Sequence, residues 1–169
     1  MEILKASTDW ARAEVFSSSF FVLFGLLFML ASIGFWYLGK TEIAKAFNIP
    51  TMVAGVLLLI IGLGIMFANH TRQASFTEAY ENDAPAFVAS EMVRTEKSMG
   101  EYARVVFKAI PVIIILCALA IMFIETPIWR SSAITILAMM AVILVIDSNA
   151  NARIEAYHTQ LLAHSDQKP

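Results

Sequence analysis

Four long apolar runs most constrain what this chain can fold into. They cover about residues 16–38, 51–68, 105–124 and 128–146. Because an α-helix rises ~1.5 Å per residue, about twenty apolar residues cross the ~30 Å hydrocarbon core of a membrane. Hydrophobic residues make up 59% of the chain and charged residues 15%, whereas a soluble domain has about half and about a quarter. The sequence therefore predicts an all-α integral membrane protein of one domain, residues 1–169, with four transmembrane helices in two hairpins and helical cytosolic extensions.

A polar arm of residues 69–104 joins the two hairpins, and its residues are mostly helix formers. The sequence Asn82-Asp83-Ala84-Pro85 is the strongest break in this arm, and it predicts a turn followed by a capped helix. From Phe87 onward, apolar residues recur at helical spacing, with Glu91 and Arg94 on the other side. A mixed-charge face of this kind is typical of a solvated surface, so we expect a helical hairpin in water.

The segment before the first apolar run is short and mixed in character. Ser7, Thr8 and Asp9 are residue types that cap helices, so they predict a helix start just before the membrane. Trp10 has the amphipathic ring that favours the headgroup level. The run of residues 16–38 is longer than the ~7–15 apolar residues of a signal peptide, and we interpret it as a retained helix.

Two positions outside the arm predict local departures from long straight helices. Thr41 is expected to cap a short helical turn between the first two runs. Pro111 either lies in the first turn of the third helix or kinks a helix that continues from the arm. In the second case it leaves the carbonyl of Phe107 without its usual partner.

The distribution of lysine and arginine predicts the orientation. Nine cations lie in the two tails and the arm, namely Lys5, Arg12, Arg72, Arg94, Lys97, Arg104, Lys108, Arg153 and Lys168. Three lie in the short turns, namely Lys40, Lys45 and Arg130. Because cytoplasmic loops carry an excess of lysine and arginine, we expect both termini and the arm on the cytosolic side of a bacterial inner membrane.

Asp147 is the most informative polar residue, because it directly follows the fourth apolar run, where ionisable groups are costly and usually paired. Steps of four, four and three place Asn151, Glu155 and His158 on the same helix face. The simplest interpretation is an interface carboxylate that holds two helices together. Two alternatives stay open, a proton or ion relay and contact with a partner protein.

Further polar residues are expected near this face. Arg104 and Lys108 are four residues apart at a similar predicted depth, so one of them is expected to pair with Asp147. His70 would join His158 and Asp147 if the ends of the second and fourth helices touch. Imidazole and carboxylate suit several metals, but the chain has no fixed ligand spacing such as HExxH. We therefore predict no metal site, no cofactor and no catalytic residue.

Small residues on the second apolar run predict close helix packing. Gly55 and Gly62 are seven residues apart, and Gly64 and Ala68 have the four-residue spacing that lets helices approach closely in lipid. Packing within one chain is the simpler interpretation, and contact in a homo-oligomer is the alternative. Cys117 is expected to serve packing.

Several short motifs lead to a resemblance that covers most of the chain. These motifs are Ile49-Pro50 followed by Gly55 and Gly62, then Arg72, and then Glu91-x-x-Arg94 before the third span. Through them the chain resembles small bacterial inner-membrane proteins of four spans that have no assigned activity. In architecture it is also similar to immunity proteins that protect bacteria from pore-forming toxins. Those proteins are small and polytopic, and they have almost no extramembrane domains.

The sequence favours binding over catalysis. A net charge of −2 without a basic stripe gives no reason to expect nucleic acid as a partner. The central turns of the runs have no ionisable group, which a transporter of polar solutes usually needs. We expect a non-enzymatic binding protein of the lipid bilayer, either an immunity protein against a membrane-targeting toxin or an accessory subunit of a membrane complex. An oligomeric channel or small transporter is the first alternative, and a membrane enzyme with a cytosolic-interface site is the second.

Overall fold

The computed structural model describes residues 2–166, which are helical apart from short connections. The elements are α1 (Glu2–Leu38), α2 (Glu42–Ala46), α3 (Asn48–Asn82), α4 (Ala84–Arg104), η1 (Val105–Ala109), α5 (Ile110–Phe123) and α6 (Pro127–Asp166). Four helical stretches are long and apolar enough to cross a membrane, and each corresponds to one of the predicted runs. The prediction of an all-α chain with four candidate spans is confirmed.

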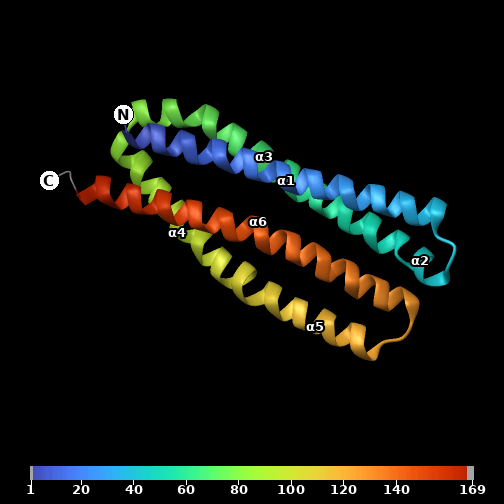
Figure 1. Ribbon diagram of the computed structural model, residues 1–169. Helices are drawn as coiled ribbons and strands as arrows, with labels where there is room; N and C mark the ends of the chain where they lie inside the picture. Colours follow the sequence, from blue (N-terminus) through green and yellow to red (C-terminus); the bar gives the residue numbers. More distant parts are fainter. Residues whose placement is uncertain (1, 167–169) are drawn as a thin grey trace.

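The chain path brings the polar parts together at one end of the molecule (Figure 1). The α3–α4 turn lies beside the start of α1 and the end of α6, and the two short connections lie at the opposite end. The predicted orientation requires the two tails and the arm on one side of the membrane, and the described parts of all three lie at one end of the molecule. Lys168, one of the cations in that prediction, lies outside the described residues.

The long helices continue without a break from the apolar runs into the polar regions. α1 has 37 residues and α6 has 40, which correspond to lengths of about 55 Å and 60 Å. Both lengths exceed the ~30 Å of a hydrocarbon core. We call the polar part, residues 2–15, 69–104 and 147–166, the head. The arm is therefore not a separate hairpin in water, because its two helices pack with α1 and α6.

Two predicted helix starts are present. The carboxylate of Asp83 accepts a hydrogen bond from the backbone N–H of Ala86 at 2.9 Å, which caps α4. The hydroxyl of Thr41 accepts a hydrogen bond from the N–H of Ala44 at 3.1 Å, which caps α2. Both are typical N-caps, in which a side-chain oxygen pairs with an N–H that has no partner in the helix.

The predicted start of the first helix is wrong. α1 already begins at Glu2, and Ser7 and Thr8 are inside it. Their hydroxyls donate to the carbonyls of Ile3 and Leu4, at 2.9 Å and 2.8 Å. A serine or threonine inside a helix can bond to the preceding turn in this way, so the presence of capping residues did not fix the boundary.

A π-helical turn, η1, joins α4 to α5 just before Pro111. The N–H of Ile110 donates to the carbonyl of Val105, five residues earlier. Proline has no N–H, and its ring clashes with the carbonyl four residues before it, here that of Phe107. A π-turn widens the helix at this place, so the chain passes from arm to span as a continuous helix that is disturbed before the proline.

α1 and α3 approach each other closely along the apolar half. A Cβ atom at Gly55 would lie 2.8 Å from the carbonyl oxygen of Gly25, and one at Gly62 would lie 2.8 Å from the Cβ of Phe21. Only glycine permits this spacing, so these glycines serve packing within one chain. Gly64 differs, because a Cβ there would meet no atom within 4 Å.

α5 lies at the edge of the apolar half. It packs against α6 and η1 and against no other helix in the described part of the chain. Figure 1 shows α6 between α5 and the α1–α3 pair. Ile110 and Cys117 are the buried residues of α5, and its other apolar side chains are exposed or half-buried. Burial of Cys117 agrees with a packing role.

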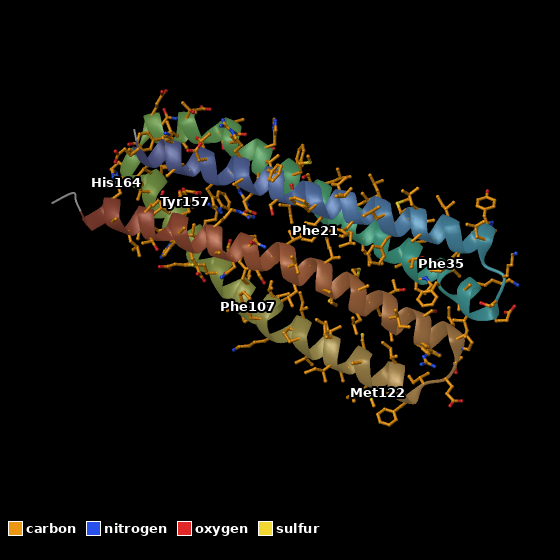
Figure 2. All side chains as sticks on the ribbon, viewed as in Figure 1. Phe21, Phe35, Phe107, Met122, Tyr157 and His164 are labelled. Atoms are coloured by element: carbon orange, nitrogen blue, oxygen red, sulfur yellow. The ribbon has the colours of Figure 1, made fainter. Side chains whose placement is uncertain are left out.

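The head has an apolar core to which α1, α3, α4 and α6 all contribute. Its buried residues are Ile3, Trp10, Ala11, Phe76, Phe87, Val88, Ile154, Tyr157 and Leu161. The ring of Trp10 is only 8% exposed and stacks on Tyr157 with the centroids 5.5 Å apart. The ring is therefore covered by protein, and its position at the headgroup level stays a prediction. Figure 2 shows Tyr157 in the head and Phe21 further along the bundle.

Candidate functional site

A buried polar network crosses the head between α4, α6 and α1. Glu91 forms a bidentate pair with Arg94, with N–O distances of 2.8 Å and 2.6 Å. Glu91 also accepts a hydrogen bond from the Tyr157 hydroxyl at 2.9 Å, and that hydroxyl lies 2.7 Å from the hydroxyl of Ser7. The guanidinium of Arg94 lies 4.3 Å from the ring centre of Trp10. Glu91 is 5% exposed, so the expectation that it lies on a solvated face is wrong.

A second charged pair lies closer to the apolar half. Nε of Arg153 donates to Glu14 at 3.0 Å, and the carboxylate side chain is only 8% exposed. Burial raises the pKa of Glu14, and the charge of Arg153 partly opposes this effect. Nη2 of the same arginine is buried without a hydrogen-bond partner in the described part of the chain. This pair links α1 to α6 across 139 residues of sequence.

A cavity of about 290 Å³ lies where the head meets the apolar half. Four helices line it, and its polar lining includes Glu14, Asn69, Arg72, Arg94, Tyr102 and Asp147. We call it the inner cavity. On the head side it is bounded by Trp10 and Ile154, and on the side of the apolar half by Phe21 and Ile146. This half-open space is lined by four helices and carries several charged side chains at the edge of an apolar region, which makes it the strongest candidate for a binding site.

Arg72 is the least compensated cation in the inner cavity. Its side chain is half-buried, and Nη1 donates to the amide oxygen of Asn69 at 3.0 Å. Among the described residues it has no carboxylate within ion-pair distance. Burial lowers its pKa, the positive charge of Arg94 lowers it further, and the charge of Glu91 acts in the opposite direction. Such a cation is stabilised by an added anion.

Asp147 is the carboxylate of the inner cavity that has no partner. It accepts no hydrogen bond and forms no ion pair within the described chain. Burial and the negative charge of Glu14 raise its pKa to about 6. The predicted pairing with Arg104 or Lys108 is not found. Both cations are exposed, and Nε of Arg104 donates instead to the carbonyl of Gly100 at 3.1 Å.

The other predicted members of this face do not form one site with Asp147. Asn151 donates to Glu155 at 2.6 Å in an exposed pair. Nδ1 of His158 lies 2.7 Å from the hydroxyl of Thr95, and His70 is exposed.

The spacing along α6 explains this separation. Asp147 and His158 are eleven residues apart on one helix, which is about 16 Å along its axis. In the part of the chain that the structure describes, no three His, Cys, Asp or Glu residues are grouped to hold a metal ion.

Several residues of the inner cavity were not predicted from the sequence to belong to a site, above all Trp10, Glu14 and Arg72. A signal for two of them exists. Steps of four, three and four connect Trp10, Glu14, Ser17 and Phe21, so one face of α1 carries polar residues in line with its buried apolar side. Polar residues on a helix face that is otherwise buried predict a polar region in the interior of the bundle. Arg72 has no comparable signal, because its burial depends on where α4 crosses α3.

Comparisons with known proteins give no match. No model of a protein family matches the chain, and searches of the curated proteins and of the solved structures return none either. The functional argument accordingly rests on the inner cavity and the charges around it.

Proposed function

We propose that this chain is a non-enzymatic binding protein of a membrane, and that the inner cavity holds an anionic group. The observation that carries this proposal is Arg72, a half-buried guanidinium that lines the cavity without an acidic partner in the described chain. A half-buried charge without a counter-charge is costly to a fold, so its position beside this half-open space suggests that a ligand supplies the counter-charge. Arg94 lines the same space.

The donors around the cavity fit an oxyanion. Arginine presents five N–H groups in a planar fork that suits carboxylate and phosphate oxygens. Glu91 occupies Nε and Nη2 of Arg94, which leaves Nη1 for a ligand. The indole N–H of Trp10, another lining residue, is buried without a partner among the described residues. Asn69 and Tyr102 add polar groups to the same wall.

The fluorescence of Trp10 gives a direct test with inorganic phosphate as the probe. Trp36 and Trp129, which are 69% and 66% exposed, are replaced by Phe, so that Trp10 is the sole tryptophan of the chain. Phosphate added to this protein in mild detergent should change the emission of Trp10 in a saturable way, and Arg72→Gln should weaken the response at least tenfold.

The matched control for this test is Arg12→Gln, which removes an exposed cation from the same helix as Trp10. It should leave the response to phosphate unchanged. No saturable response in the parent protein, or an equal response in the Arg72 variant, would refute an anion site at this cavity.

The biological setting that the sequence predicts remains part of the proposal: a bacterial inner membrane, the head in the cytosol, and a toxin or a membrane complex as partner. The outer face of α5 is where lipid or a partner within the bilayer would lie, because α5 packs on α6 and η1 alone among the described helices. In-cell crosslinking followed by mass spectrometry tests this. One stoichiometric foreign protein would support it, and self-crosslinks alone would refute it in favour of an oligomer.

A further inference from the structure

A second hollow adjoins the inner cavity on the side of the apolar half. It has a volume of about 290 Å³ and shares Ile65, Ser98, Tyr102 and Asp147 with the inner cavity. We call it the side opening. Its remaining walls come from Glu101, Val105 and Val106, at the junction of α4 and η1. Because the two hollows share four lining residues, we treat them together as one path, which runs from the head toward the surface between α3 and η1.

The chemistry of this path changes along its length. Arg72 and Arg94 line only the inner cavity, whereas Val105 and Val106 line only the side opening. On α3, Ile65 precedes Arg72 by seven residues, which is about 10 Å along the helix axis. Val105 is 55% exposed and lies where the third apolar run begins. A ligand that fills both spaces would therefore have an anionic end deep in the head and an apolar part that leaves toward lipid.

Resting on the proposed function, we infer that the occupant is a membrane lipid with a terminal phosphate, which enters sideways between α3 and η1. Its phosphate lies at Arg72 and Arg94, and its acyl chains leave past Val105. Carboxylates also face the path, Asp147 at the neck and the exposed Glu101 in the side opening. The part of the lipid that lies beside these carboxylates is its uncharged glycerol and ester region.

Two features favour a lipid with a terminal phosphate. Such a phosphate has three acceptor oxygens, so one group can accept from Arg72 and from Nη1 of Arg94, which the pair with Glu91 leaves free. Outside the path, Arg104 and Lys108 flank Val105 and Val106 in sequence, and both are exposed without an acidic partner in the described chain. Basic residues at this level attract anionic lipid.

The test uses the single-tryptophan protein in nanodiscs of phosphatidylcholine, with or without a minor fraction of phosphatidic acid, and in detergent with inorganic phosphate. Val105→Phe narrows the side opening. Val112→Phe is the matched control, because Val112 is also 55% exposed but lies on α5, away from the opening.

The expected result is a change in Trp10 emission with phosphatidic acid but not with phosphatidylcholine alone. Arg72→Gln and Val105→Phe should each reduce this response at least fivefold, while Val112→Phe leaves it unchanged and Val105→Phe still binds inorganic phosphate.

The other outcomes separate the two proposals. If inorganic phosphate binds but phosphatidic acid gives no response, the lipid inference is overturned and the anion site stands. If neither binds, both are overturned. A response to phosphatidic acid that Arg72→Gln leaves unchanged, or an equal response to phosphatidylcholine, would indicate lipid around the spans and would also overturn the inference.

Discussion

Replacing Asp147 with Asn should stabilise the protein, and by an amount that depends on pH. The carboxylate of Asp147 has no hydrogen-bond or ion-pair partner in the described chain, and its pKa is raised from 3.8 to about 6. Between these two values the folded protein holds the proton more tightly than the unfolded chain does. The protonated side chain therefore stabilises the folded state relative to the ionised one. This stabilisation is fully present below about pH 4 and is lost as the pH rises through about 6.

The size of the effect follows from the same two pKa values. A shift of about two units corresponds to roughly 3 kcal/mol at pH 8, where both states are ionised, and to about 1 kcal/mol at pH 4.5. Because asparagine is nearly the same size and uncharged, Asp147→Asn should raise the unfolding free energy by up to these amounts. The side chain is only half-buried, so the measured gains should be somewhat smaller.

The assay is reversible unfolding in mixed micelles with increasing denaturing detergent, followed by circular dichroism at pH 8 and pH 4.5. Glu78→Gln, which removes an exposed carboxylate from α3, is the matched control and should change stability by less than about 0.5 kcal/mol. A gain of equal size at both pH values would refute the titration argument. A loss of stability at pH 8 would show that the carboxylate has a favourable partner.

Two further changes test the packing of the helices. Gly62→Val should destabilise the fold by about 1–3 kcal/mol or more, because a Cβ at Gly62 would lie 2.8 Å from a side-chain atom of α1. Gly64→Val is its control, because Gly64 has open space around it. Equal melting temperatures of the two variants would contradict the proposed contact. Arg153→Met should cost about 3–5 kcal/mol, since it leaves the buried carboxylate of Glu14 unpaired. The double variant Arg153→Met with Glu14→Gln should recover much of that loss, and a double variant as unstable as the single one would count against the pair.

The sequence predicted those parts of the fold that depend on the properties of a single helix. The lengths of the apolar runs predicted the four candidate spans, and Asp83, two residues before Pro85, predicted the turn between α3 and α4. Helix ends within the polar parts were less predictable. Ser7 and Thr8 are good capping residues, but they also fit inside a helix, and packing of α1 in the head core keeps the helix intact to Glu2.

The candidate site was predictable only in part, because it depends on how helices face one another. The sequence singled out Asp147, and the inner cavity contains it. Its expected partners were chosen by depth alone, and depth does not fix the direction in which a side chain points. Arg104 and Lys108 are at a suitable depth but on the exposed side of α4 and η1. The opposite error affected Glu91, which lies between two helices and is buried.

The position of the inner cavity follows from the path of the chain. In the head, α4 packs against α3 and α6 and closes a bundle of four helices. At η1 the chain turns away before Pro111, and α5 then contacts only α6 and η1 among the described helices. The fourth wall of the bundle is therefore missing beyond Tyr102, and the α1–α3–α6 group must end its polar core there. A space with Arg72 on one side and the start of an apolar run on the other is the expected consequence, and it explains why the unpaired charges of the head gather at this level.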